Sequence, residues 1–276
     1  VGAALECWAE EDNIGISKFA MLGNRVDIDE TELLEFFSKD RTTDVIALYL
    51  EGVKEGREFF KIAEEASEKK KIAVLKGGRS EKGSEAVITH TRSLAGEYNV
   101  FKSVCKQAGL IPVESIRELY AISKGVAGLP EPKGKNTIIL TSSGGSGILA
   151  ADAAEDLDVN LMDLPEKGIE RLKNNLPSEC IISNPVDLTG SANAEMFDEA
   201  IKILARYKDV HCIVTIIGDP MPGIADVIKE RFERLTIIPV MLGGGKEESE
   251  ERKKLVEAGI PVFTTPESAM RALSAL

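Results

Sequence analysis

Short apolar runs alternate with amphipathic stretches along this chain, and this alternation limits the folds that it can adopt. In the first half, apolar runs predict strands at 16–22, 44–50 and 71–75. Amphipathic stretches predict helices at 30–39, 55–69 and 97–108. Strands that alternate with helices in this way form a parallel sheet covered by helices.

The pattern stops near the middle of the chain and then starts again. Residues 128–136 contain two prolines and two glycines, which is typical of a linker. After it we expect strands at 137–141, 212–217 and 237–241, and helices at 148–156, 166–175, 195–206, 222–234 and 247–258. The sequence therefore predicts an α/β protein of two flavodoxin-like, doubly wound domains with parallel sheets, at 1–127 and 137–276, joined by the 128–136 linker.

Composition excludes several classes of function. The 276 residues carry a net charge of -12, which argues against sequence-independent binding of nucleic acid, because such binding needs many Lys and Arg side chains facing phosphates. No apolar run is long enough to span a bilayer, and we find no signal peptide. The four cysteines are widely separated, which argues against a zinc site or a disulfide framework. We expect a cytoplasmic protein whose partners are neither nucleic acid nor membrane.

His90 is the first candidate for chemistry. It is one of two histidines, and it lies among hydroxyl-bearing and small residues where a polar segment gives way to a helical pattern. A neutral imidazole can act as a nucleophile near pH 7 when an acceptor holds its second ring nitrogen. The other histidine, His211, opens an apolar strand, where a structural role is expected.

Glu51 and the segment Ser142–Gly147 are the next candidates. Glu51 follows the apolar run 44–50, and parallel-sheet proteins place functional groups at the carboxyl ends of strands. The Gly-rich segment joins a strand to a helix, where unpaired backbone N–H groups and the helix dipole attract anions. Ser143, Gly144, Gly145, Ser146 and Gly147 are therefore candidate phosphate-binding residues, although a tight structural turn would have the same composition.

Six segments carry a resemblance to a known family. They are 23–29 (GNRVDID), 44–52 (DVIALYLEG), 76–96 (KGGRSEKGSEAVITHTRSLAG), 142–147 (SSGGSG), 184–190 (NPVDLTG) and 258–263 (AGIPVF). In this order they closely resemble the NDP-forming acyl-CoA synthetases, the group of ADP-forming acetate–CoA ligases related to succinyl-CoA synthetase. The resemblance extends over essentially the whole chain.

The resemblance implies an activity and a set of roles. The reaction would be acid + CoA + ATP = acyl-CoA + ADP + phosphate, through an acyl phosphate and a phosphohistidine. His90 would carry the phosphoryl group, Glu51 would orient it, and the backbone of 143–147 would cradle phosphate. Asn184 and Asp187 would lie beside that cradle as auxiliary residues. The family's fold implies two succinyl-CoA synthetase-like domains.

Two positions depart from the family pattern around the histidine. Thr89 stands where the family has serine, and it keeps the hydroxyl. Arg92 stands where the family has glycine, which places a long cation two residues from the imidazole. Arg92 is an auxiliary candidate because it would either bind the phosphoryl group through a charge-assisted pair of hydrogen bonds or obstruct the loop.

The family implies partners that this sequence does not resemble. In the complete enzyme ATP or ADP with Mg and CoA would bind to an ATP-grasp domain or subunit and to a CoA-binding domain, and the helical pattern that starts at Val1 suggests a piece of a larger synthetase. We expect a small carboxylic acid and phosphate as substrates and an oligomeric assembly. Two alternatives stay open: a non-catalytic regulatory or ligand-binding module, for example fused to an acetyltransferase, and a two-lobed small-molecule receptor.

Overall fold

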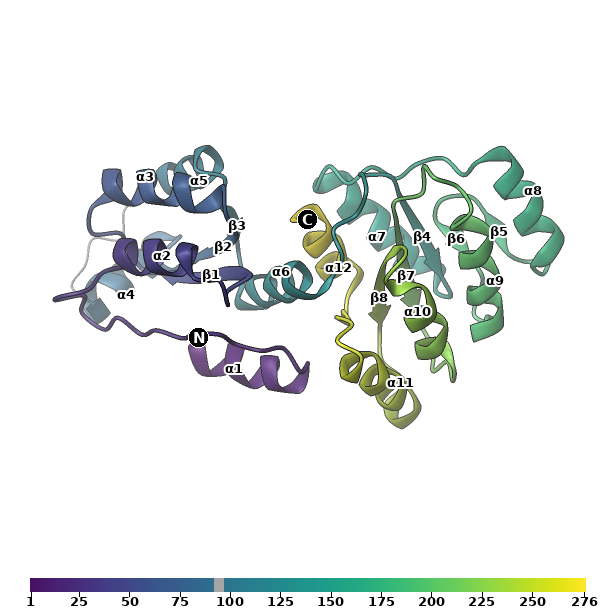
Figure 1. Ribbon diagram of the computed structural model, residues 1–276. Coiled ribbons are helices and arrows are strands. Elements are labelled where there is room, and N and C mark those ends of the chain that lie inside the picture. Colours follow the sequence, from purple (N-terminus) through teal and green to yellow (C-terminus); the bar gives the residue numbers. More distant parts are fainter. Residues whose placement is uncertain (92–96) are drawn as a thin grey trace. The chain divides into compact units, whose positions relative to one another are not determined.

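The structure is a computed structural model that describes residues 1–91 and 97–276, with only the backbone described at 88, 90 and 91. The chain divides into two compact units, Val1–Ala127 and Gly128–Ser274. Figure 1 shows that each unit combines helices with strands of a central sheet.

The first unit is built on a three-stranded parallel sheet in the order β1-β2-β3. Its strands are β1 (Val45–Leu50), β2 (Lys71–Lys76) and β3 (Ile111–Val113). Its helices are α1 (Gly2–Glu11), α2 (Glu30–Lys39), α3 (Gly56–Ser67), α4 (Glu81–Thr91), α5 (Tyr98–Gln107) and α6 (Ile116–Gly128). Asp29 and Glu32 form a capping box that fixes the start of α2, because each side chain accepts from a backbone N–H at that end.

Side chains alternate between the two faces of this sheet. Ile46, Ile72 and Val74 pack with buried residues of α2, α3 and α5. Ala73 and Leu75 pack with Leu119 and Ile122 of α6 instead, together with Val113 of β3. This period of two is the pattern of strands covered on both faces.

The second unit has a five-stranded sheet in the order β5-β6-β4-β7-β8, parallel except for the β5–β6 pair. Its strands are β4 (Thr137–Thr141), β5 (Ile181–Ile182), β6 (Val186–Asp187), β7 (Cys212–Ile217) and β8 (Thr236–Met241). Its helices are α7 (Gly144–Asp156), α8 (Glu166–Asn175), α9 (Ala194–Leu204), α10 (Ile224–Phe232), α11 (Gly245–Glu257) and α12 (Pro266–Ser274).

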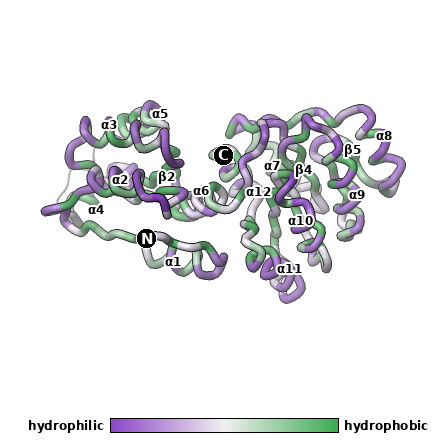
Figure 2. The backbone as a smooth tube through the Cα atoms, viewed as in Figure 1, coloured by the Kyte–Doolittle hydropathy of each residue, from purple (hydrophilic) through white to green (hydrophobic). Residues whose placement is uncertain are grey.

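The core of this unit lies against both faces of the sheet. Ile138, Ile213 and Ile237 pack with apolar residues of α8, α9, α10 and α11. On the other side α7 contacts β4, and α12 contacts both α7 and β8. Every residue of β4, β7 and β8 is buried, as expected for strands that are covered on both faces. Figure 2 shows the hydrophilic and hydrophobic residues that alternate along the surrounding helices.

The predicted α/β class and the parallel sheets are confirmed, and several element predictions are corrected. Residues 16–22 do not form a strand: they run as irregular chain in which Ile16, Phe19 and Met21 are largely exposed. A strand needs a neighbour that takes up its backbone hydrogen bonds, and residues 14–19 instead line a cavity together with Val45–Ala47 of β1. The helix predicted at 148–156 begins earlier, at Gly144.

The helices α4, α6 and α12 and the short strands β3, β5 and β6 were not predicted from the sequence. Among the helices within 1–91 and 97–276, none combines the length and the apolar character of a membrane-spanning segment.

Candidate functional site

Glu51 lies where sequence reasoning placed it, directly after β1 at the carboxyl end of the first sheet. The Tyr49 hydroxyl donates to Glu51 Oε1 at 3.2 Å, and burial together with the nearby Glu51 charge raises the pKa of Tyr49. Lys76 ends the neighbouring strand and is 4% exposed. Burial lowers the pKa of Lys76, while the Glu51 charge opposes that shift. One carboxylate, one phenol and one ammonium therefore meet at this edge.

Because Gly77 has no side chain, the side chains of Tyr49 and Glu51 can lie close to its backbone. A Cβ at Gly77 would come within 3.0 Å of the Tyr49 hydroxyl oxygen and 3.4 Å of Glu51 Cγ. The Gly77 N–H donates to the Leu50 carbonyl at 2.8 Å, which holds the two strand ends together. A side chain at this position would crowd the Tyr49 hydroxyl that donates to Glu51.

His90 lies in the last turn of α4 by its backbone. The sequence analysis placed it at a change from polar segment to helix, but the helix begins at Glu81, nine residues earlier. Thr89 uses its hydroxyl within the helix and donates to the Glu85 carbonyl at 2.9 Å. The predicted auxiliary residue Arg92 lies outside the described residues.

The predicted phosphate cradle is the first turn of α7. Ser143 is the N-cap and makes no capping hydrogen bond with its side chain, and Gly144–Gly147 are the first four helical residues. The first N–H groups of a helix have no acceptor within the helix, so those of Gly144, Gly145 and Ser146 are oriented as anion donors. The hydroxyls of Ser143 and Ser146 lie 3.0 Å apart at the same turn.

Asp187 lies beside this turn as the last residue of β6. A Cβ at Gly144 would come within 2.6 Å of Asp187 Oδ2, so only glycine fits there. The other carboxylate oxygen, Oδ1, accepts from the Thr189 N–H at 2.8 Å. A negative side chain at a helix N-terminus is stabilised by the helix dipole, and it also opposes a second anion.

Asn184 has its side-chain amide bound to backbone groups. Its Oδ1 accepts from the Ile139 N–H, and its Nδ2 donates to the carbonyls of Thr137 and Met162, each at 2.9 Å. Both N–H donors of the amide are therefore used. In this structure Asn184 holds the chain next to the cradle and directs no donor toward it.

Sequence reasoning assigned no role to several residues that shape both sites. Ser142, the first residue of the predicted Gly-rich segment, accepts from the Gly218 N–H at 3.0 Å, which ties β4 to the end of β7. Thr141 Oγ1 accepts from the Ser143 N–H and donates to the Ser143 carbonyl, both at 2.9 Å. Lys76 closes an apolar strand, and the same strand-end rule that selected Glu51 would have selected it.

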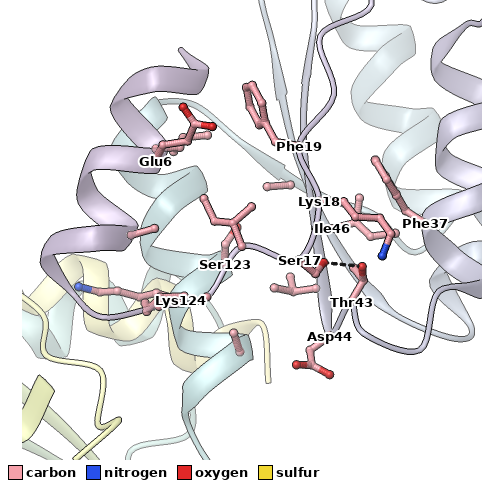
Figure 3. Close-up of a pocket in the computed structure, with 18 of the residues that line it drawn as sticks. Glu6, Ser17, Lys18, Phe19, Phe37, Thr43, Asp44, Ile46, Ser123 and Lys124 are labelled. Atoms are coloured by element: carbon pink, nitrogen blue, oxygen red, sulfur yellow. Dashed lines mark hydrogen bonds between the residues drawn. The ribbon is translucent and has the colours of Figure 1, made fainter. Parts of the chain in front are cut away.

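A cavity of about 210 Å³ in the first unit has a different character (Figure 3). It lies between α1, residues 14–19, the first half of β1 and α6. Several of its polar groups bind each other: Ser17 to Thr43 at 2.8 Å, and Lys18 to Thr42 at 3.0 Å. Because these groups are engaged and most of the lining is apolar, we do not assign phosphate chemistry to this cavity.

Metal-binding clusters are absent from the part of the chain that the structure describes: no three His, Cys, Asp or Glu side chains there could hold an ion. The four cysteines form no disulfide, and two of them, Cys105 and Cys212, are buried.

Comparison with known proteins places both units in one family. Residues 1–126 match the succinyl-CoA ligase like flavodoxin domain, and residues 137–272 match the ligase-CoA domain. The alpha subunit of acetate–CoA ligase [ADP-forming] I from Pyrococcus furiosus is 40% identical over all of this chain and 61% of its own length. The chain belongs to the NDP-forming acyl-CoA synthetase family.

Other synthetases of this family agree in sequence and in structure. Acetate–CoA ligase [ADP-forming] I from Archaeoglobus fulgidus is 37% identical, over 99% of this chain and 39% of its own length. The acetyl-coenzyme A synthetase 1 of Ca. Korarchaeum cryptofilum, solved with phosphate and ADP, superposes with a TM-score of 0.89 at 33% identity, over 99% of this chain and 61% of that chain. This chain thus spans between about two fifths and three fifths of the length of these synthetases.

Proposed function

We propose that this chain is the phosphoryl-carrying part of an NDP-forming acyl-CoA synthetase. The reaction is acid + CoA + ATP = acyl-CoA + ADP + phosphate, through an acyl phosphate and a phosphohistidine at His90. The supporting observation is Glu51: it lies at the carboxyl end of β1, hydrogen-bonded by Tyr49, in the unit whose helix α4 carries His90.

The central step, in the direction that consumes acyl-CoA, follows from the chemistry of a neutral imidazole. One ring nitrogen of His90 attacks the phosphorus of the acyl phosphate, so that an N–P bond forms while the P–O bond to the acyl group breaks. The carboxylate leaves with the electron pair. Glu51 accepts the hydrogen bond of the second ring nitrogen, which selects the reactive tautomer and stabilises the charge that develops on the ring. ADP then takes the phosphoryl group to give ATP, and the neutral imidazole is restored.

The first turn of α7 supplies the anion-binding part of this proposal. Phosphate is held by the backbone N–H groups of 144–146, flanked by the hydroxyls of Ser143 and Ser146. Asp187 and Asn184 are auxiliary: the first sets the charge beside the turn, and the second fixes the neighbouring chain. Arg92, two residues after His90 in the sequence, stays an auxiliary candidate that would either bind the phosphoryl group or obstruct the loop.

The remaining components belong to the complete enzyme. ATP or ADP enters with Mg on an ATP-grasp domain or subunit, CoA enters on a CoA-binding domain, and the acid is a small carboxylic acid. One relative carries the name of an alpha subunit, which supports an assembly of several chains.

Transfer of radioactive phosphate tests this function. With a nucleotide-binding partner, the protein is expected to take label from γ-labelled ATP into an acid-labile, base-stable linkage. His90→Ala is expected to abolish the label, and His211→Ala is the matched control, since His211 accepts from the Asn136 N–H in the second unit. Undiminished labelling of His90→Ala would refute the role of His90.

A further inference from the structure

The chain that follows β1 is held by side chains at three backbone groups within residues 51–54. Lys76 Nζ donates to the Glu51 carbonyl at 2.9 Å. Arg25 Nη1 donates to the Gly52 carbonyl at 2.8 Å. Glu30 Oε1 accepts from the Lys54 N–H at 2.6 Å. Loops after strands are usually held by backbone contacts or water, so this number of side-chain contacts from three separate elements is a specific feature of this loop.

Lys76 also connects this loop to the next strand end. Its Nζ donates to the Gly77 carbonyl at 2.8 Å, next to the bond from the Gly77 N–H to the Leu50 carbonyl. Gly77 begins the segment that leads into α4, the helix of His90. One ammonium group therefore joins the backbone of Glu51 to the start of the segment that carries the histidine.

Arg25 and Glu30, which bind the backbone of Gly52 and Lys54, also contact each other. Arg25 pairs with Glu30 at 3.1 Å, and the side chain of Glu30 is 2% exposed. Arg25 itself has a φ of 53°, a left-handed conformation that is unfavourable for a residue with a side chain. Strained backbone of this kind persists where surrounding contacts fix it, and it is frequent near functional sites.

Burying an ammonium group is costly unless it is hydrogen-bonded, and an apolar residue at the end of β2 would fill the same space without that cost. Packing of the core alone therefore does not explain why a charged residue, Lys76, ends this strand. Its two acceptors are the backbone carbonyls of Glu51 and Gly77, and its charge also acts on the Glu51 carboxylate.

We propose that Lys76 is a positioning residue, supported by Arg25 and Glu30, that fixes the Glu51 carboxylate relative to the segment leading into α4. This inference rests on the proposed function, because it assigns Lys76 to the phosphoryl transfer at His90. Lys76 acts through Glu51 and touches no reacting atom.

Lys76→Met is the decisive variant, and Lys124→Met is its matched control. Lys124 is also buried in the first unit, at 5% exposure, but it pairs with Asp12 at 2.8 Å and lies far along the chain from Glu51. Both variants remove a buried ammonium group and keep an unbranched side chain that is one atom shorter. The first removes the contacts to Glu51 and Gly77, and the second leaves them in place.

The measurement is single-turnover labelling from γ-labelled ATP, with the nucleotide-binding partner supplied, over a range of ATP concentrations. We expect Lys76→Met to lower the rate constant by about 100-fold, because small displacements of a catalytic group have effects of this size. The ATP concentration for half-maximal rate should stay unchanged. Lys124→Met should lower the thermal midpoint and keep the wild-type rate constant, and Lys76→Arg should recover part of the rate.

A second measurement needs neither nucleotide nor partner: hydrogen exchange at the Gly77 amide. We expect faster exchange in Lys76→Met than in Lys124→Met. Glu30→Gln, which keeps the size of its side chain, should slow labelling by about tenfold and gives a milder variant should Lys76→Met not fold.

The outcomes separate the two proposals. If the wild type labels at His90 and Lys76→Met labels equally fast, the positioning role is wrong and the proposed function stands. If the wild type takes no label, the proposed function is wrong. In that case the exchange measurement still tests the role of Lys76. Equal exchange of the Gly77 amide in Lys76→Met and Lys124→Met would show that Lys76 does not hold this loop, and faster exchange in Lys76→Met would support that role.

Discussion

Asp187 Oδ2 lies only 2.6 Å from the position that a Cβ on Gly144 would take. The relationship joins the end of β6 to the first residue of α7, two elements separated by about 40 residues of sequence. It explains in steric terms why glycine occupies this position in the first turn. It also places a negative charge next to the N–H groups that we assign to phosphate.

Gly144→Ala is expected to destabilise the second unit by about 1–3 kcal/mol, the usual cost of overpacking. The added methyl group must displace the Asp187 carboxylate, which Thr189 holds from the other side. Gly145→Ala is the matched control, because no atom lies within 4 Å of its added Cβ. Alanine favours the helix there by up to about 1 kcal/mol. Thermal unfolding of both variants tests the pair, and an equal loss in both would contradict the steric explanation.

Asp187→Asn is expected to raise the affinity for inorganic phosphate by about fivefold. Removal of a like charge from a partly exposed site is worth on the order of 1 kcal/mol. The asparagine oxygen still accepts from the Thr189 N–H, so the loop should keep its shape. Calorimetric titration with phosphate at fixed ionic strength measures the change. A lower affinity in the variant would show that the carboxylate assists binding, for example through a bound cation.

Stability at acid pH should depend on Asp40. Hydrogen bonds from Lys18 first and from Thr43 second hold the pKa of Asp40 well below its ordinary 3.8. The folded state therefore favours the ionised carboxylate, and the associated stability is complete above about pH 5 and is lost as the pH falls through 4 and below. Asp40→Asn lacks this ionisation and should lose less of its thermal midpoint between pH 6 and pH 3. A steeper acid loss in the variant would contradict this assignment.

Alkylation of the thiols should follow their exposure. Cys7 is exposed, whereas burial raises the pKa of Cys105 to about 12 and also raises that of the fully buried Cys212. The thiolate is the reactive form, so iodoacetamide at pH 8 should modify Cys7 first and the two buried thiols only after unfolding. Peptide mass spectrometry over time distinguishes the sites. Early modification of Cys212 would indicate that β7 opens in the native state.

Regular periodicity decided which parts of the fold were predictable from sequence. The strands 137–141 and 212–217 and the helix 30–39 agree residue for residue with β4, β7 and α2, because long apolar runs and a capping box mark their limits. The prediction at 16–22 was wrong because the residues alone do not reveal whether a neighbouring strand is present. Tertiary context decides such a segment.

Those residues of the candidate site that follow a simple rule of strand ends or helix starts were predictable from the sequence. The end of a strand selected Glu51, and glycines before a helix selected 143–147. The same strand-end rule also covers Lys76, whereas Arg25 lies in irregular chain and its contact to the Gly52 carbonyl leaves no trace in the pattern of side chains. The family resemblance placed Asn184 near the cradle, and in the structure its amide binds three backbone groups.

The Asn184 amide has a consequence for the short strand β6. Two residues make too few ladder bonds to define which residue of β6 stands opposite Thr141 of β4. Asn184 binds two backbone groups on the edge of β4 that faces β6, the Thr137 carbonyl and the Ile139 N–H, and so sets the register before the strand begins. A slip of one residue would turn Asp187 to the opposite face of the sheet. The Asn184 side chain therefore determines that the Asp187 carboxylate lies beside the first turn of α7.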